Sequence, residues 1–430
     1  MVRVKRSIRR KQGSTATREP GKSLKMTEDS DQAESSFRMV STPSEAKSLM
    51  DAVPLAPLVS LKEKDSHHHD NEKKSRVLMP CVGYGTYKLG KDKVVDATFC
   101  ALECGYRMID TAFIYGGETT EALVAKALQK ALGKGTIQSR QDVFITTKHW
   151  RKYHGYEASF KCLDLSLKRL QVDYVDLWLM HWPGPAWKTM FHKKTVERWE
   201  NAVIEESRMV DVRAETWRAM EDAYRKGLVK AIGVSNMTVQ HLQTLKKTAT
   251  LWPPAVNQVE LHPLHPQQEL LEYARKEGIV IQAYASLGGQ DAGKKKWTEL
   301  LGTTMIDGKK MVPCDFLNAD EVVELASQMT HQDDDGTEGN PVTSAQLLLR
   351  WGLDRGCTLV PKTSRLQRMK ENANIFDFKL SEEQVDGLQA LLRHRLKENS
   401  GARGPDGEED LEKLTRLCWR RDPLRHLDFE

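Results

Sequence analysis

Residues 143–181 contain one complete repeat of the pattern that decides the fold: VFITTK (143–148), FKCLDLSLKRL (160–170) and DLWLMH (176–181). The first and third segments are short apolar runs of strand-forming residues. The middle segment repeats apolar residues at helical spacing and predicts one buried stripe, which consists of Phe160, Leu163, Leu167 and Leu170. A strand, a helix and a strand in this order indicate two parallel strands joined by a right-handed crossover.

The same alternation continues on both sides of this repeat. EALVAKALQKALGKG (121–135) predicts an amphipathic helix that stops at Gly133, and TWRAMEDAYRKG (216–227) predicts one that ends at Gly227. Further apolar runs bring the candidate strands to eight, at residues 82–85, 107–110, 229–235, 255–261, 279–285 and 357–362. Eight units in about 300 residues predict an α/β fold, a (β/α)8 TIM barrel. A doubly wound open sheet would show the same alternation.

The first 75 residues differ in composition from the rest. They are rich in charged residues and serine, and Phe37 is their only aromatic residue, so they cannot bury enough apolar area to offset the entropy of ordering. We therefore expect a disordered basic and polar extension over residues 1–75, the barrel over residues 76–395 and a C-terminal tail over residues 396–430. The basic start, MVRVKRSIRRK, also fits an organelle-targeting peptide or a nuclear signal.

Overall composition argues against several classes of partner. The 430 residues carry a net charge of +5 (65 basic and 60 acidic residues), which is too small to indicate nucleic-acid binding. No apolar run approaches the roughly 18–20 residues of a membrane helix. Seven scattered cysteines without a Cys-x-x-Cys pair favour a reduced compartment. We expect a cytoplasmic monomer with no nucleic-acid or membrane partner. No metal site is expected, because His67, His68 and His69 are interpreted as part of a polar tract.

Two glycine-containing segments imitate nucleotide-binding motifs. GGQDAGKKK (288–296) resembles a phosphate loop, but Lys295 stands where Ser or Thr would bind magnesium. VGYGTYKLG (82–90) lacks the glycine spacing of a Rossmann turn. If the chain binds a nucleotide, it must therefore do so with residues other than a phosphate loop or a Rossmann turn.

Charged and ionisable residues close three of the predicted strands: Asp110, Lys148 and His181. Each would be costly to bury alone. A single histidine at the end of a buried strand is more often a core residue, but a carboxylate, an ammonium and an imidazole at three strand ends predict one site at the C-terminal edge of a barrel. Tyr115 follows Asp110 by five residues, in the loop TAFIYGGE (111–118).

From about Arg76 to Leu392 the chain resembles the aldo-keto reductases. The resemblance rests on seven motifs in family order: GYRMIDTAFIYGGE (105–118), ITTKHW (145–150), YVDLWLMHWP (174–183), KAIGVSN (230–236), NQVELHP (257–263), AYASLG (283–288) and VPKTSRLQRMKEN (360–372). It implies a barrel that binds an extended nicotinamide dinucleotide, NADPH or NADP+, without a Rossmann fold.

The resemblance implies a catalytic tetrad of Asp110, Tyr115, Lys148 and His181 that reduces a small-molecule carbonyl substrate. A phenol, with a pKa of about 10, is a poor acid at neutral pH, but an adjacent ammonium stabilises the phenolate and eases proton release. Lys148 would supply this charge and Asp110 would compensate it. His181 would orient and polarise the carbonyl group.

The resemblance also implies a set of cofactor-binding residues: Gly85, Thr86, Tyr87, Ser235, Asn236, Gln258, Tyr284, Leu287, Lys362, Thr363, Ser364, Arg368, Glu371 and Asn372. Within this set, Ser235, Asn236 and Gln258 would bind the nicotinamide carboxamide. Tyr284 would stack on the nicotinamide ring, with a barrel-packing tyrosine as the alternative. Lys362 and Arg368 would bind the adenosine 2′-phosphate, and Glu371 and Asn372 would hold the adenine.

The expected substrate-binding residues are Tyr87, Trp150, His181 and Trp182, whose rings suggest an aromatic-tolerant pocket. The chain departs from the family pattern at Ala285 and Ser286, where Ser and Pro are usual, at Met237 and at Tyr87. Segments 184–212 and 287–318 and the tail from Arg393 are long, and residues 331–340 look like a surface insertion between two helices. Two other interpretations are a cofactor-binding regulatory or structural protein and a non-redox barrel enzyme.

Overall fold

The computed structural model describes residues 37–61, 77–185, 209–289, 297–306, 310–332 and 338–400. Its centre is an eight-stranded sheet in the order β17-β12-β11-β9-β8-β7-β6-β5, and neighbouring strands are parallel throughout. The strands are β5 (Tyr84–Gly85), β6 (Met108–Asp110), β7 (Phe144–His149), β8 (Val175–Met180), β9 (Val229–Ser235), β11 (Val256–Glu260), β12 (Val280–Tyr284) and β17 (Thr358–Leu359). Each of the eight predicted strands is present.

The two edges of this sheet meet and close it into a barrel. The backbone N–H of Gly83 donates to the carbonyl of Leu359, and the N–H of Leu359 donates to the carbonyl of Cys81, both at 2.8 Å. A parallel bridge joins Val82 to Leu359. Closure distinguishes the barrel from an open doubly wound sheet, so the predicted (β/α)8 barrel is confirmed.

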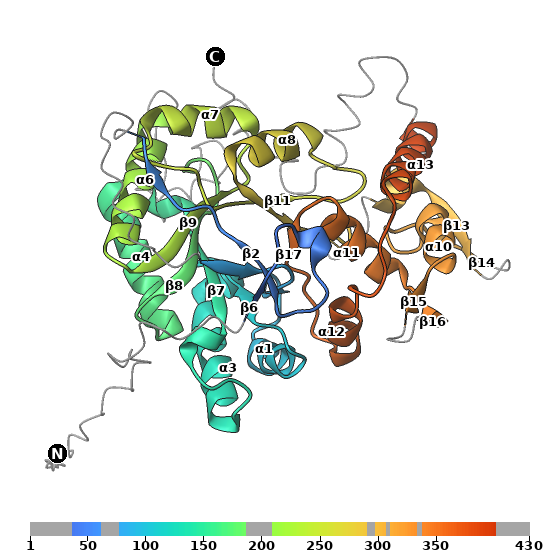
Figure 1. The fold of residues 1–430 in the computed structure, drawn as a ribbon, viewed down its shortest axis with the longest axis horizontal. Coiled ribbons are helices and arrows are strands. Elements are labelled where there is room, and N and C mark those ends of the chain that lie inside the picture. The colour runs from blue at the N-terminus through green and yellow to red at the C-terminus, as the bar shows by residue number, and fades with distance from the viewer. Residues whose placement is uncertain are drawn as a thin grey trace, which may run out of the picture.

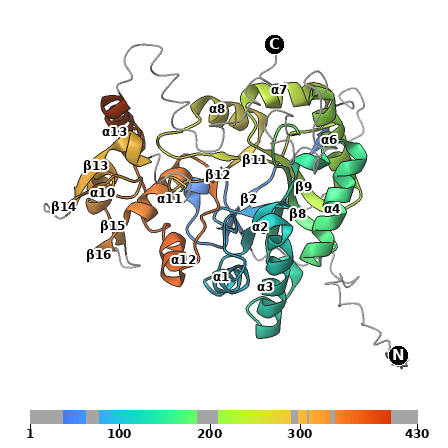
Figure 2. The same cartoon turned by 180° about the vertical axis from the view of Figure 1, so that it is seen from behind.

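Helices surround the barrel on its outer side (Figure 1, and from behind in Figure 2). They are α1 (Val94–Glu103), α3 (Thr120–Lys134), α4 (Tyr156–Leu170), α6 (Met209–Arg225), α7 (Val239–Thr248), α8 (Gln268–Glu277), α11 (Ser344–Asp354) and α12 (Leu366–Ala373), with the short α2 (Tyr115–Glu118) after β6. The predicted helix stop at Gly133 is wrong. α3 continues to Lys134, and Gly135 ends it in the left-handed conformation with φ 71°, which glycine adopts without strain.

The expectation of a disordered extension over residues 1–75 is wrong for residues 37–61. This segment forms β1 (Arg38–Met39), β2 (Asp51–Pro54) and β3 (Val59–Ser60). β2 pairs antiparallel with β4 (Leu78–Pro80) and contributes the buried Val53 to the core, and Leu55, directly after β2, is buried as well. The buried Asp51 accepts hydrogen bonds from Arg38. Residues 1–36 and 62–76, with the three histidines, lie outside the described residues.

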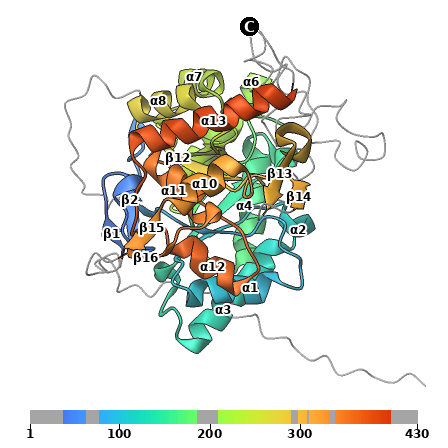
Figure 3. The same ribbon diagram turned by 90° about the vertical axis from the view of Figure 1, so that its right-hand side faces the viewer.

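The barrel also extends past residue 395, where we expected a tail to begin. Helix α13 (Glu382–Ser400) crosses this boundary with Leu396 buried, and Figure 3 shows it running across α10 (Asp320–Ser327) and α11. Arg395 donates to the carbonyls of Leu301 and Thr303, each at 3.1 Å, and contacts Glu321 at 2.9 Å. Helix α13 thereby holds residues 301–303 of the long segment that follows β12.

Two antiparallel hairpins lie at the side of the barrel near α10. One pairs β13 (Thr303–Ile306) with β14 (Lys310–Pro313), and the other pairs β15 (Thr330–Gln332) with β16 (Glu338–Pro341) between α10 and α11. The second hairpin is the predicted insertion between two helices. Most of the long segment 184–212 lies outside the described residues.

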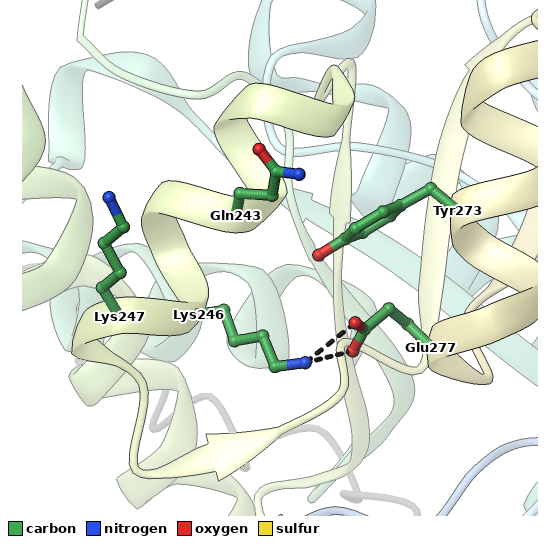
Figure 4. Close-up of a pocket in the computed structure, with 5 residues that line it drawn as sticks. All are labelled: Gln243, Lys246, Lys247, Tyr273 and Glu277. Atoms are coloured by element: carbon green, nitrogen blue, oxygen red, sulfur yellow. Dashed lines mark hydrogen bonds and ion pairs between the residues drawn. The ribbon is translucent and has the colours of Figure 1, made fainter.

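A pocket lies on the outer surface between α7 and α8 (Figure 4). It is lined by Gln243, Lys246, Lys247, Tyr273 and Glu277. Lys246 donates to both carboxylate oxygens of Glu277, at 2.6 and 2.8 Å. None of these residues belongs to the predicted site. Among the described residues, no helix is long and apolar enough to span a membrane.

Candidate active site

The barrel brings three predicted site residues to neighbouring strand ends. Asp110 is the last residue of β6 and is paired in register with Thr146 of β7. Lys148 lies two residues further along β7, opposite Leu179 of β8. His181 directly follows β8. Parallel pairing places the C-terminal ends of these strands at one edge, so Asp110 and Lys148 meet although they are 38 positions apart in the sequence.

Lys148 lies at the centre of the site, and its side chain is fully buried. Its Nζ donates to the two carboxylate oxygens of Asp110 at 2.7 and 2.8 Å, to the Thr111 carbonyl at 2.9 Å and to the Tyr115 hydroxyl at 3.1 Å. Burial lowers the pKa of Lys148, and the Asp110 carboxylate opposes that shift. The carboxylate therefore supports a cation beside the phenol.

Tyr115 begins α2, whose next two residues, Gly116 and Gly117, have φ values of 59° and 66°. These left-handed positions favour glycine, and they turn the chain immediately after the tyrosine. The Tyr115 ring lies 4.9 Å from Nζ of Lys148, and its centroid is 5.9 Å from that of His181. Tyr115 is 8% exposed, with its hydroxyl beside the Lys148 ammonium and its ring beside the His181 imidazole.

His181 is neutral at ordinary pH. Burial lowers its pKa well below the usual value, and the nearby charges of Lys148 and Arg151 lower it further. Its backbone carbonyl accepts a hydrogen bond of 2.9 Å from the side chain of Asn236, which links the end of β8 to the end of β9. A neutral imidazole can donate one N–H to a carbonyl oxygen without bringing a second full positive charge next to Lys148.

The residues expected at the nicotinamide lie together, at the ends of β9 and β12 and in the middle of β11. The Tyr284 hydroxyl donates to Oδ1 of Asn236 at 2.6 Å, and Nδ2 of Asn236 contacts the Ser235 hydroxyl at 3.1 Å. Ser235 donates to the backbone carbonyl of Gln258 at 2.7 Å, and Gln258 itself donates to Asp110 at 2.7 Å. This polar cluster therefore adjoins the tetrad and fits a carboxamide, which needs both donors and acceptors.

The residues expected at the phosphate and adenine lie on a separate segment, in the turn after β17 and on α12. Thr363 is buried and its hydroxyl accepts the N–H of Arg365 at 3.1 Å, which precedes the free N-terminal amides of α12. Ser364 and Arg368 are exposed, Lys362 and Glu371 are half-buried, and Asn372 is buried. Exposed cations at a helix N-terminus fit a phosphate group.

Four further predicted cofactor residues lie near the start of the barrel and after β12. Thr86 donates from its hydroxyl to the Asp110 carbonyl at 2.9 Å, and Leu287 is half-buried after β12. Gly85 has a packing reason to be glycine, because a Cβ there would lie 2.7 Å from the carbonyl oxygen of Val360. Tyr87 is 53% exposed, and its ring centroid lies 5.0 Å from that of Tyr115.

Aromatic side chains surround His181. The ring centroids of Trp150 and Trp182 lie 5.7 and 6.2 Å from the imidazole. Together with Tyr87 they place aromatic surface beside Tyr115 and His181. Sequence reasoning missed Arg151, which lies 5.3 Å from the Trp182 ring and donates to the Pro185 carbonyl at 3.2 Å. Nothing in its local sequence distinguishes it from a surface arginine.

Comparison with known proteins identifies the family of this chain. The model of the aldo/keto reductase family matches residues 81–393. The chain belongs to the aldo-keto reductase family. It is therefore an oxidoreductase that acts on carbonyl compounds with NADP(H) as its cofactor. The matched region contains every predicted site residue.

Several named aldo-keto reductases and several solved aldo-keto reductase structures are similar to this chain. The glyoxal reductase of Bacillus subtilis is 34% identical over 319 residues, which cover 73% of this chain and 90% of that protein. The NADPH-dependent D-xylose reductase of Meyerozyma guilliermondii is 32% identical over 73% of this chain and 91% of its own. A Bombyx mori aldo-keto reductase in complex with NADP has a TM-score of 0.57 and 27% identity, covering 78% of this chain and 92% of that one.

Proposed function

We propose that this aldo-keto reductase converts aldehydes or ketones to alcohols with NADPH, with Tyr115 as the proton donor. The observation that carries the proposal is the position of the Lys148 ammonium, within 2.7–3.1 Å of both Asp110 and the Tyr115 hydroxyl. An intact arrangement of this kind favours catalysis over a purely regulatory or structural role, because a binding protein has no need of a buried cation beside a phenol.

Bound NADPH would supply the hydride that is added to the carbonyl carbon. Tyr115 would donate its proton to the carbonyl oxygen, and the Lys148 ammonium would stabilise the phenolate left behind. Asp110 would keep Lys148 charged and in place. The neutral His181 would donate a hydrogen bond to the same carbonyl oxygen and so orient the substrate. Tyr87, Trp150 and Trp182 would exclude water around the reacting carbon.

The aromatic surroundings favour carbonyl compounds with a flat or apolar portion. The similar proteins point to two further classes, because one is named a glyoxal reductase and another a D-xylose reductase. A screen of NADPH oxidation over glyoxals, sugar aldehydes, aromatic aldehydes and ketosteroids would rank these classes.

We also propose that the protein works as a cytoplasmic monomer. The six cysteines in the described part of the chain are free thiols, and size-exclusion chromatography tests the oligomeric state.

The Tyr115→Phe variant tests the proposed function. It removes the acid and keeps the ring, so turnover should fall by about 10²–10⁴-fold, the usual contribution of a general acid, while the affinity for NADPH stays near that of the unmodified protein. Stopped-flow NADPH oxidation and fluorescence titration measure the two quantities. Turnover within a factor of three of the unmodified enzyme would refute the assignment of Tyr115.

A further inference from the structure

A polar side chain lies inside the barrel, at a position where burying an apolar side chain would cost less free energy. Gln282, in the middle of β12, is fully buried. Its Nε2 contacts two thioether sulfurs, Met79 Sδ at 3.9 Å and Met108 Sδ at 3.6 Å. Thioethers are weak acceptors, and burying an amide is costly unless it forms good hydrogen bonds. The strong interaction of Gln282 must therefore be at its other end.

The carbonyl end of the Gln282 side chain is connected to the candidate active site through Gln258. Oε1 of Gln282 accepts a hydrogen bond of 2.5 Å from Nε2 of Gln258, and the same Nε2 donates to Oδ2 of Asp110 at 2.7 Å. The Asp110 carboxylate can only accept, so Gln258 has to turn its amide nitrogen toward it. Gln282 then has to turn its carbonyl oxygen toward that nitrogen. The charge of Asp110 thus orients two buried amides in succession.

We propose that Gln282 is a positioning residue that fixes the amide of Gln258 for the nicotinamide carboxamide. The two N–H bonds of Gln258 are taken by Asp110 and Gln282, so its Oε1 is the atom offered to the cofactor, as an acceptor for the carboxamide N–H. Without Gln282, one N–H of Gln258 loses its partner, and Asp110 alone restrains the rotation of the amide. This inference rests on the proposed NADPH-dependent function and on the expected position of Gln258 at the carboxamide.

The first experiment is a double-mutant cycle read out by the dissociation constant of NADP+, measured by quenching of protein fluorescence. Gln282→Met keeps the volume and removes the acceptor. It should weaken NADP+ binding by about threefold to tenfold, the factor that a single hydrogen bond contributes. In a Gln258→Leu background the same substitution should have no further effect, because Gln282 acts through Gln258. An equal loss in both backgrounds, or no loss in the first, would overturn the proposal.

A matched control separates positioning from packing. Met79→Leu changes the side chain that packs under Gln282 but leaves the bond between Gln282 and Gln258 intact. It should lower the melting temperature about as much as Gln282→Met while the affinity for NADP+ is retained. If Met79→Leu weakens NADP+ binding as strongly as Gln282→Met, the effect is one of packing and the proposal is wrong.

The second experiment uses the unmodified protein, so it holds even if Gln282→Met does not fold. The 3-acetylpyridine analogue of NADP+ has a methyl group in place of the carboxamide nitrogen and cannot donate to Gln258. It should bind about threefold to tenfold more weakly than NADP+, and Gln282→Met should abolish this difference. Equal binding of analogue and NADP+ to the unmodified protein would overturn the proposal. Neither outcome affects the assignment of Tyr115, which is judged by turnover of Tyr115→Phe.

Discussion

The carboxylate of Asp110 and the ammonium of Lys148 form a bidentate ion pair inside the barrel, with Nζ of Lys148 2.7 and 2.8 Å from the two carboxylate oxygens. Both side chains are at most 5% exposed. Water therefore cannot take over the role of either partner if the other is removed, and the pair links the stability of the barrel to its chemistry.

Replacing Asp110 by Asn should lower stability and activity together. The substitution leaves the Lys148 ammonium buried without its counter-charge, which typically costs about 3–5 kcal/mol, and it removes the support for a cation beside Tyr115. Urea unfolding and steady-state turnover measure the two effects. The control is Asp164→Asn, which breaks an exposed pair with Lys168 and should change neither. Unchanged unfolding of Asp110→Asn would contradict the importance of the pair.

Arg368→Ala should weaken NADPH binding and spare NADH. A charge-assisted hydrogen bond contributes about 1.5–3 kcal/mol, so the dissociation constant for NADPH should rise by roughly 10- to 150-fold. NADH has only a hydroxyl where NADPH carries the 2′-phosphate. The control is Lys370→Ala, an exposed cation on the same helix, two residues away and so on the opposite face. Equal losses for both variants, or equal affinity of the unmodified protein for both cofactors, would contradict the site.

Stability should fall as the pH drops from about 6.5 to about 4. Burial lowers the pKa of His149 to about 4, whereas a histidine in the unfolded chain titrates near 6.5. Between these values the unfolded state binds a proton that the folded state does not, so acid favours unfolding. The difference corresponds to about 3 kcal/mol. His149→Leu should reduce the pH dependence of the unfolding free energy in this window by up to one proton, while the other buried histidines keep their share. His394→Gln, at an exposed histidine, should not reduce it.

Removing residues 1–61 should destabilise the barrel, whereas removing residues 1–36 keeps every contact described above. The longer deletion strips β2 from β4 and uncovers the buried Met79. It also removes the Ser44 carbonyl that accepts a hydrogen bond of 2.9 Å from the buried Arg350. Losing the burial of Val53 and Leu55 alone costs about 3–6 kcal/mol. Thermal unfolding of the two truncated proteins checks this, and equal melting temperatures would show that residues 37–61 contribute nothing.

Local patterns predicted most of the barrel. The eight strands are apolar runs bounded by helical segments, and this alternation depends on near neighbours in sequence. The end of α3 was missed because Gly133 and Gly135 give the same local signal, and Gly135 is the one that has the left-handed conformation. The segment 37–61 was missed for a different reason. It contains 13 apolar residues out of 25, but this signal was diluted when the composition was taken over all of residues 1–75. Its order comes from β4 and from Arg350, which lies 306 residues beyond Ser44.

The sequence by itself determined that Asp110, Lys148 and His181 lie at one edge, because parallel strands in consecutive order end on the same side of a barrel. It also places Gln282 within the strand segment 279–285, between Ile281 and Ala283, but assigns that residue no role. Only the tertiary structure decided what that residue does. Gln258 lies 148 residues from Asp110 and 24 from Gln282, and no local pattern records which side chains meet across a barrel interior. Close packing of the folded chain sets those distances, and with them the direction in which each buried amide points.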